Sequence, residues 1–381
     1  MHETRASQLP DMFDPGLARD PYPAYARLRR GPDVLRDSER DRWIIHRYAD
    51  VRRVLRDAET FSSANASFEH TLLGTDGEAH DRVRRALAPN FSPAGVRQLR
   101  DAVLLRVTQA LDALASLGTG DIITELAIPL PLTIVSQMLG LPTSDSAKLE
   151  TWVEAILDSD EFGAIPPYQI PEYRRALGEH FTGFRAEGSS LVVRAFEDFP
   201  SGLTLDERID IGLLLIVAGL ETTTNLIGSA VQVLLRDPLL ARQLRQEPDL
   251  VGPFIEEVLR HRSPIQRTRR RATHAATVGG DSIPADAKLV VLIGAANRDP
   301  SKFADADDFQ PFRKPNDHLG FGSGAHSCLG LWLARMEATL AIQGLLQRFS
   351  VIEAAGPIDD MKHLNSLTVL GPARLDIAVH A

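Results

Sequence analysis

The ten residues FGSGAHSCLG, Phe321–Gly330, hold the only cysteine of the 381-residue chain. Glycines at three of these positions let the backbone pass close to a bulky, flat neighbour. Cys328 stands directly before an apolar run that predicts a helix over 329–348. The dipole and free N–H groups at the start of a helix favour a thiolate, so Cys328 is a candidate metal ligand.

Several interpretations of Cys328 are open on the loop alone. A lone cysteine is most often a small buried hydrophobe. A zinc site with His326 fails because structural zinc takes four nitrogen or sulfur ligands and the chain has no second cysteine. Nucleophilic Cys–His catalysis is conceivable but carries no recognisable signature here. Haem needs a single axial thiolate, because the porphyrin supplies the four in-plane ligands, and it accounts for the loop.

Composition indicates a globular enzyme in the cytoplasm. The chain is 44% apolar, and its single cysteine excludes an intramolecular disulfide framework. Residues 1–16 are polar, so neither a signal peptide nor a membrane anchor is expected there. The most apolar run, 209–235, is interrupted by the polar residues 221–225, which favours a core helix over a membrane span. The net charge of −9 argues against general nucleic-acid binding.

Hydrophobic periodicity predicts a mainly helical fold. Between Ser92 and Gly118, apolar residues recur at helical spacing, with Ser92 and Pro93 as the start and Gly118 as the end. Similar reasoning predicts seven further helices and weaker ones between 145 and 195. The seven ranges are 22–30, 48–56, 79–88, 131–140, 205–236, 250–262 and 329–348.

Strand signals are few. The segments 41–47 and 287–296 read as strands, and the turn at 279–286 is of the kind that joins hairpin strands. The proline-rich segment 162–173 reads as a surface loop. The sequence therefore predicts a mainly α fold with a minor β portion, in a single domain over residues 1–381.

A polar cluster interrupts the long apolar helix at AGLETTT, 218–224. Buried acids and hydroxyls are costly unless they are hydrogen-bonded or useful. Gly219 weakens the helix, and the Thr222 hydroxyl can compete for the carbonyl four residues back, so a bend or groove is expected. A helix end or a satisfied polar patch is an equal alternative on these residues alone.

Two further clusters contain charged pairs at helical spacing. Glu257 and Arg260 are three residues apart, and His80 and Arg84 are four apart. Together with Arg270, the second cluster could clamp the carboxylates of a cofactor. In most helices such side chains are simply solvated, and that alternative stays open here.

Taken in order, these pieces resemble the cytochrome P-450 family of haem-thiolate monooxygenases, from about residue 20 to the C-terminus. FGSGAHSCLG agrees with that family's F-G-x-G-x-H-x-C-x-G loop at every fixed position. The resemblance implies that Cys328 is the proximal iron ligand and Phe321 its packing neighbour, with Gly322 and Gly330 beside the cofactor. It also implies the cytochrome P-450 fold, with haem between a long distal helix and the cysteine loop.

Other motifs extend the resemblance. AGLET is similar to the family's A-G-x-[DE]-T motif, which implies that Ala218 and Gly219 line the haem and that Glu221 and Thr222 are the catalytic acid–alcohol pair. EEVLR is similar to its E-x-x-R helix, so Glu257 and Arg260 are implied to pair with Arg313. The remaining agreements are ANRDP at 296–300, HLGFG at 318–322, and the implied propionate ligands His80, Arg84, Arg270 and His326.

The family implies haem b as cofactor, O₂ as co-substrate, and a small, largely apolar organic substrate, in secondary metabolism. Electrons are expected from a separate ferredoxin and ferredoxin reductase, with NAD(P)H serving only indirectly, since one cysteine cannot hold an iron–sulfur cluster. A basic patch for an acidic ferredoxin is expected from residues 80–85 and Arg335. No nucleic-acid or membrane partner is expected, and the protein is expected to be a monomer. A non-catalytic haem-thiolate sensor and a peroxide-driven enzyme of the same fold are the alternatives.

By analogy with the family, substrate contacts are expected from five places. These are 61–78, 158–190, the distal helix at Leu214, Leu215 and Ala218, 265–268, and 367–369. Phe68, Leu72, Leu73 and Phe162 favour an apolar or aromatic ligand, although scattered residues of these types are most often core.

Overall fold

The computed structural model describes residues 9–64, 72–141, 171–183, 192, 195–196, 202–358 and 362–380. The chain forms two compact units. The first consists of Met1–Ala64, Glu256–Cys328 and His363–Leu370, and the second of Asn65–Ile255, Leu329–Lys362 and Gly371–Ala381. A single domain over residues 1–381 stays a prediction.

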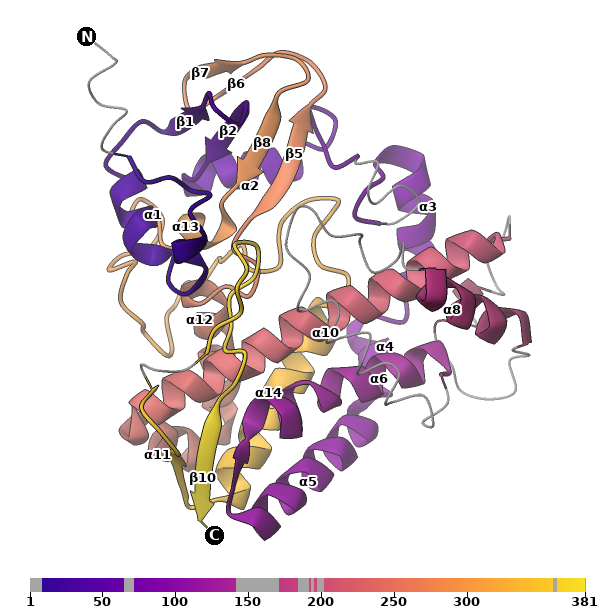
Figure 1. Ribbon diagram of the computed structural model, residues 1–381, viewed down its shortest axis with the longest axis vertical. Coiled ribbons are helices and arrows are strands. Elements are labelled where there is room, and N and C mark those ends of the chain that lie inside the picture. The colour runs from indigo at the N-terminus through magenta and orange to yellow at the C-terminus, as the bar shows by residue number, and fades with distance from the viewer. Residues whose placement is uncertain are drawn as a thin grey trace. The chain divides into compact units, whose positions relative to one another are not determined.

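A five-stranded sheet organises the first unit. Its strands, in spatial order, are β1 (Val34–Asp37), β2 (Arg42–Ile45), β8 (Lys288–Val291), β5 (Thr268–Ala272) and β3 (Phe61–Ser62). Only the β2–β8 pair is parallel, with Arg42 opposite Lys288. Figure 1 shows the indigo N-terminal strands beside the orange β8 and β5, so segments more than 200 residues apart in the sequence form one sheet.

Consecutive residues of β8 supply two apolar clusters, as expected when side chains alternate across a sheet. Leu289 and Val291 pack with Ala272 and with helix α2 (Tyr48–Arg56). Val290 packs with Met12 and with helix α1 (Tyr22–Leu28). The smaller elements of this unit are α13 (Ile293–Ala296), the end of α12 (Val251–His261), and the hairpin of β6 (Ala276–Val278) and β7 (Asp281–Ile283).

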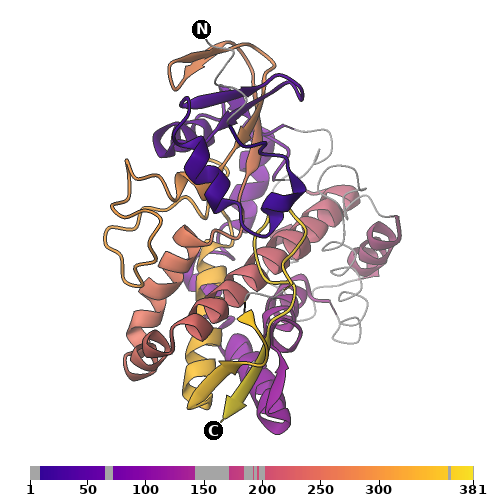
Figure 2. The same cartoon turned by 60° about the vertical axis from the view of Figure 1, so that its left-hand side comes forward.

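The second unit is mainly helical. Its longest element, α10 (Leu205–Arg236), packs against α6 (Pro129–Leu139), α8 (Pro171–Gly183) and α14 (Leu331–Arg348). Figures 1 and 2 both show α10 as the long helix beside α14. The other elements of this unit are α3 (Gly77–Leu87), α4 (Pro93–Arg97), α5 (Arg100–Leu117), α11 (Pro238–Gln246), the π-helical turn Ile123–Ala127, and a small sheet of β4 (Thr119–Asp121), β10 (Asp376–His380) and β9 (Val351–Ala354).

Helix α10 begins at a capping box, in which Glu207 N donates to Thr204 Oγ1 and Thr204 N donates to Glu207 Oε2. A Cβ on Gly212 would lie 3.1 Å from the Phe181 ring, so this glycine lets α8 approach closely. Within the described part of the chain, α10 is the one helix long and apolar enough to cross a membrane, and 72% of its most apolar window is buried in protein. Such burial is typical of a core helix.

Most predicted helices are confirmed. The ranges 48–56 and 205–236 agree at both ends, and the others begin and end within two residues of the prediction. The predicted helix over 92–118 is divided into α4 and α5, because Gln98 N and Leu99 N turn back to the carbonyls three residues before them. Gly118, at φ 71°, ends α5 as expected.

The strand predictions need correction at their ends. The strand predicted over 287–296 ends at Val291, because Ala296 N and Asn297 N make i→i−4 bonds that form α13. The glycine pair at 279–280 joins β6 to β7, while residues 284–287 lead into β8. The loop predicted over 162–173 lies mostly outside the described residues, and Pro171 already begins α8. The mainly α fold with a minor β portion is confirmed.

The buried acid Glu337 on α14 makes a stability prediction. Burial raises the pKa of Glu337 to about 8, and its Oε1 has no hydrogen-bond partner. Because the folded-state pKa lies above the ordinary value, protonated Glu337 contributes fully to the free energy of unfolding below about pH 4.5. This contribution is lost as the pH rises through 8, and each unit of pKa difference corresponds to about 1.4 kcal/mol. We expect Glu337→Gln to raise the unfolding temperature at pH 8 and to change it much less at pH 5.

Thermal unfolding at the two pH values checks this expectation, with Glu353→Gln on exposed strand β9 as the control. An equal effect of Glu337→Gln at pH 5 and pH 8 would show that ionisation of Glu337 is not the cause.

Candidate active site

The cysteine loop of the first unit is held by its own backbone. Cys328 N donates to Phe321 O at 2.8 Å, and Gly322 N donates to Leu319 O at 2.8 Å. Gly322 and Gly324 have φ values of 70° and 82°, which favour glycine. A Cβ on Gly324 would lie 2.7 Å from Arg56 Cα, so the loop is pressed against the end of α2.

Cys328 is in no disulfide, is partly exposed and lies three residues before α14. In the described part of the chain, no group of three or more His, Cys, Asp or Glu side chains could hold a metal ion. A single thiolate on a loop with close backbone packing therefore fits a cofactor that brings its other metal ligands with it. Haem is such a cofactor.

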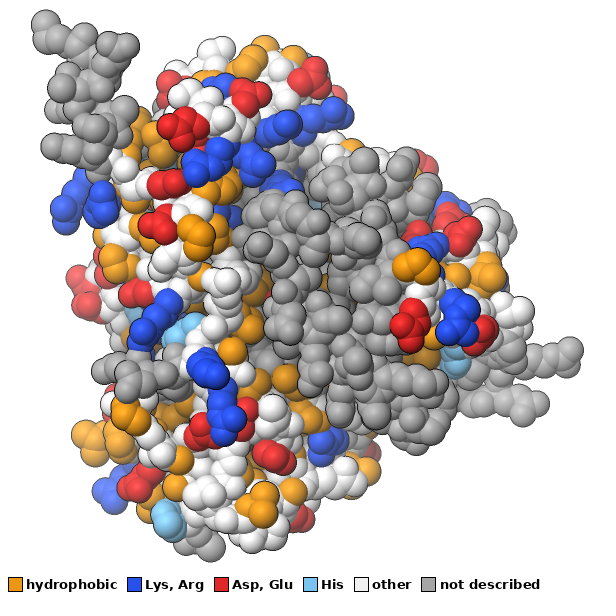
Figure 3. Space-filling view, in the orientation of Figure 1, with side chains coloured by type: hydrophobic (Ala, Val, Ile, Leu, Met, Phe, Trp, Pro, Cys, Tyr) orange, Lys and Arg blue, Asp and Glu red, His pale blue; other side chains and the backbone are white. Residues whose placement is uncertain are grey.

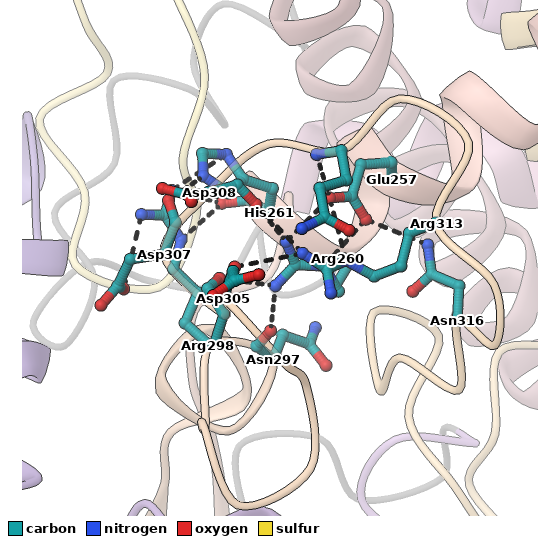
Figure 4. A network of polar contacts seen from close by, with 12 residues as sticks. Glu257, Arg260, His261, Asn297, Arg298, Asp305, Asp307, Asp308, Arg313 and Asn316 are labelled. Atoms are coloured by element: carbon teal, nitrogen blue, oxygen red, sulfur yellow. Dashed lines mark hydrogen bonds and ion pairs between the residues drawn. The ribbon is translucent and has the colours of Figure 1, made fainter.

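A buried carboxylate orders the chain that leads into this loop. Glu257 and Arg260 are both fully buried on α12, and two parallel hydrogen bonds of 2.8 Å join them (Figure 4). Arg260 also donates to three backbone carbonyls, those of Asn297, Ala306 and Asp308. The solvated surface pair considered from the sequence is therefore wrong, and the implied internal pairing is confirmed.

Glu257 receives further donors from the segment before the loop. Gln310 N donates to it at 2.8 Å, Asn316 Nδ2 at 3.2 Å and Arg313 Nε at 3.3 Å. The predicted triad with Arg313 is thus present (Figure 4). Because a buried carboxylate is stable only when its lone pairs are satisfied, these donors hold the segment in one arrangement.

The ANRDP segment makes a second attachment. Asn297 Oδ1 accepts from Leu319 N at 2.7 Å, and Asn297 Nδ2 donates to Ser263 Oγ. Burial and the neighbouring Arg298 lower the pKa of His261 to about 3, so this imidazole is neutral and its Nε2–H can donate to the Asp307 carbonyl. Asn297 thus attaches the HLGFG segment to the chain just after α12 through Leu319 N and Ser263 Oγ, and His261 attaches α12 to the chain at Asp307.

In the second unit, the predicted polar section of α10 lies within a continuous helix. Thr222 Oγ1 donates to Ala218 O at 2.8 Å, which is the back-bonding expected from the sequence. Ala218 is exposed and Glu221 and Thr222 are partly exposed, whereas residues 223–232 are all buried. The alternative of a helix end is wrong, since α10 runs on to Arg236.

The other predicted site residues divide between the two units. The first unit holds Arg270 on β5 and Phe321, Gly322, His326 and Cys328 on the loop. The second holds His80 and Arg84 on α3, Ala218, Gly219, Glu221 and Thr222 on α10, and Gly330 at the start of α14. His80 is buried, and its Nδ1 lies 2.9 Å from the Asp81 carboxylate. One shared site for all these residues stays a prediction.

Two of the predicted substrate segments meet in the first unit. Gln266 N donates to Thr368 O at 2.7 Å, and Ile265 forms a bridge with Val369. Leu72 is buried and Leu73 is half-exposed. Phe68, Phe162 and most of 158–190 lie outside the described residues.

Arg267 lies within the predicted substrate segment 265–268, but it was not singled out from the sequence, nor was its burial predicted. Its side chain is buried, and none of its three guanidinium nitrogens has a hydrogen-bond partner. Little in the sequence indicates that Arg267 is buried, because Arg267 is the first residue of RTRRR, a pattern typical of a solvated strand.

Known proteins are similar to this chain over nearly its whole length. The family model described as Cytochrome P450 matches residues 191–378. Cytochrome P450 109 of Bacillus spizizenii is 34% identical, over 94% of this chain and 92% of that protein. Cytochrome P450 monooxygenase PikC of Streptomyces venezuelae is 34% identical, over 87% and 84% of the two chains.

Solved structures agree with these sequence matches. The crystal structure of P450BioI, in complex with an acyl carrier protein ligated to hexadec-9Z-enoic acid, has a TM-score of 0.88 and 27% identity. It covers 96% of this chain and 99% of that chain, which confirms the expected fold. The chain therefore belongs to the cytochrome P450 family, whose members include haem-containing monooxygenases, and it is itself a monooxygenase of that family.

Proposed function

We propose that the Cys328 thiolate would bind the iron of haem b and that the enzyme uses O₂ to oxidise a small, largely apolar organic molecule in the cytoplasm. The carrying observation is a single cysteine on a glycine loop pressed against α2, together with the absence of a metal-binding cluster of His, Cys, Asp or Glu in the described residues. When bound, haem supplies an iron centre that binds and activates O₂. Secondary metabolism is part of the same proposal.

The side chains that would hold the cofactor supply charge and space. His80, Arg84, Arg270 and His326 would donate hydrogen bonds to the two propionates, for which charge-assisted pairs are well suited. Ala218 and Gly219 carry the smallest side chains of the exposed section of α10, so they leave room for a flat ring. Phe321, whose carbonyl accepts from Cys328 N, would pack beside the sulfur.

Glu221 and Thr222 would manage protons on the distal side. Thr222 already donates its hydroxyl proton to Ala218 O, so its oxygen lone pairs remain able to accept a hydrogen bond. Glu221, one residue earlier and partly exposed, can exchange protons with solvent and pass them on. This pair favours an oxygen-activating enzyme over a sensor, which needs only Cys328 and the propionate residues, and over a peroxide-driven enzyme.

Replacing the sulfur tests the central proposal. We expect purified wild-type protein to contain haem and its ferrous carbonyl form to absorb near 450 nm, as thiolate ligation to haem requires. Cys328→Ser should abolish that band. The readout is the reduced carbon monoxide difference spectrum, with haem content measured separately.

The paired control is Ser327→Ala, which changes the neighbouring hydroxyl and leaves the sulfur. Protein without porphyrin after expression with ample iron, or an unchanged carbonyl spectrum in Cys328→Ser, would contradict the assignment.

Removal of the Thr222 hydroxyl tests the acid–alcohol pair. We expect Thr222→Ala to keep its haem and fold but to divert most reducing equivalents to hydrogen peroxide, because the proton is no longer positioned. Product and peroxide formed per NAD(P)H consumed are measured with a surrogate ferredoxin system. Thr222→Ser, which keeps a hydroxyl, should restore much of the coupling, and unchanged coupling in Thr222→Ala would exclude this role.

The proposed electron donor is a separate acidic ferredoxin, with its reductase. Ion pairs within the chain reduce the number of basic residues that could bind this ferredoxin. Arg82 and Arg85, two of the basic residues expected to attract it, are already paired with Glu207 and Glu78. Arg335 instead lies over the ring of exposed Trp332 at the start of α14. Arg335 is therefore the better candidate for an electrostatic contact.

We expect Arg335→Gln to slow reduction by a surrogate ferredoxin several-fold at low salt and to have little effect at high salt, where charges are screened. Stopped-flow reduction at several ionic strengths measures this. Arg348→Gln, at the other end of α14, is the matched control. A salt-independent rate in the wild type would argue against an electrostatic contact.

A further inference from the structure

His318 is a buried imidazole to which the proposed function assigns no role. It is the first residue of the HLGFG segment, and its side chain is 3% exposed. Both ring nitrogens have partners in the first unit: Nε2 lies 3.1 Å from Glu256 Oε2, and Nδ1 accepts from Gly320 N at 3.1 Å. A ring held at both nitrogens has a fixed orientation, and the hydrogen bond at one nitrogen decides which form the other adopts.

The two partners of His318 assign the ring proton. The backbone amide of Gly320 can only donate, so Nδ1 accepts and carries no proton. The proton is therefore on Nε2, which donates it to the Glu256 carboxylate. The opposite tautomer would direct an N–H of the ring at the N–H of Gly320. By accepting from Nε2, Glu256 selects the one tautomer of His318 that can hold Gly320.

Gly320 lies close against helix α12. A Cβ at this position would be 3.0 Å from Leu259 O and 3.1 Å from His318 Nδ1, which is tighter than ordinary van der Waals contact. Glycine therefore lets the amide approach the imidazole closely enough for a hydrogen bond. Because Glu256 and Leu259 both belong to α12, this helix supplies the carboxylate that fixes His318 and the carbonyl against which Gly320 packs.

Gly320 is linked through one residue to the amide of Cys328. Phe321 follows Gly320 directly, and Phe321 O accepts from Cys328 N at 2.8 Å. The rings of His318 and Phe321 also lie near each other, with their centroids 6.0 Å apart. Since peptide groups are planar and rigid, a change in the contact of Gly320 N would alter the direction of the Phe321 carbonyl and with it the position of the Cys328 amide.

The contact between Glu256 and His318 differs from the ion pairs of the surface. Figure 3 shows acidic and basic side chains mixed over the visible face of the molecule, and exposed pairs of this kind contribute little because solvent screens them. The Glu256 side chain is 29% exposed, but that of His318 is buried, so their hydrogen bond is largely shielded. Loss of the carboxylate would leave a buried N–H without its acceptor, which is costly.

We propose that His318 is a positioning residue for Cys328. Through Gly320 it holds the cysteine loop in the arrangement that presents the thiolate to the iron of haem, and Glu256 keeps His318 in the tautomer that this requires. The inference rests on the proposed ligation of haem by Cys328 and adds two residues to that site. His318 contacts the backbone of the loop rather than the reacting atoms, so it is not a catalytic residue.

Two substitutions in the haem-loaded enzyme separate the two ring nitrogens. In His318→Asn the side-chain oxygen can accept from the amide two residues on, as asparagine does in turns, whereas His318→Gln carries its amide group near the position of Nε2. We expect His318→Asn to keep the 450 nm band of the reduced carbonyl form, and His318→Gln to lose this band several-fold faster in mild denaturant. Haem content and unfolding temperature are measured alongside. His274→Gln, at an exposed histidine, is the control and should behave as the wild type.

A double-mutant cycle tests the part of Glu256. Glu256→Ala should speed the loss of the 450 nm band when His318 is present, because the other tautomer becomes accessible. It should add little in the His318→Asn background, where no tautomer has to be selected. Equal effects in the two backgrounds would overturn the proposal by showing that Glu256 does not act through His318. This comparison needs no glutamine variant, so it decides the matter even if His318→Gln does not fold.

The proposal also fails if His318→Gln keeps the band as long as the wild type does, or if His318→Asn loses it as fast as His318→Gln. A loss that only follows a lower unfolding temperature would show that His318 serves the fold in general. In each of these cases an intact 450 nm band in the wild type would leave the proposed function standing. Absence of that band from the wild type would instead reject the proposed function itself.

Discussion

The carboxylate of Glu257 is the interaction on which the first unit depends. It is fully buried and receives Arg260, Arg313, Asn316 and the backbone N–H of Gln310. Breaking one partner of a buried pair leaves an uncompensated charge, at a cost of roughly 3–5 kcal/mol. Because the donors come from both α12 and the irregular chain after α13, this one group fixes a segment that has almost no regular secondary structure. The cysteine loop follows this segment directly, so the contacts of Glu257 also fix the position at which the loop begins.

Two features distinguish the proposed site: close backbone packing on the cysteine loop, and a section of small and polar residues on α10. On the loop, Gly324 meets the backbone of α2 so closely that a methyl group would collide. On α10, the section around Ala218 contains small and polar residues and is less buried than the part of the helix that follows it. Neither feature is explained by stability alone, since a continuous apolar helix and a less crowded loop would each fold at lower cost.

Long helices were predictable because periodicity, caps and breakers all act locally, as Thr204 and Glu207 show at the start of α10. The strands were harder to predict. β1, β3, β4 and β6 are two to four residues long, too short for alternation to be visible, and the partners of β3 and β4 are distant in the sequence. The residues expected to bind haem were identified from the resemblance to the cytochrome P-450 family and not from physical reasoning about the sequence. The burial of Arg267 was not predicted, because it lies near Phe13, which is distant in the sequence.

The parallel pairing of β2 with β8 has a consequence for biosynthesis. β2 ends at Ile45 and β8 begins at Lys288, so β2 must wait for the 242 residues 46–287 to be made before its partner leaves the ribosome. At about 5–20 residues per second this delay lasts on the order of 12–48 s. Throughout that time Ile44 and Ile45 lack their partners Val290 and Val291 on β8, although both side chains are fully buried in the folded protein. The nascent chain therefore exposes an unpaired, apolar strand edge, which is the kind of segment that chaperones shield.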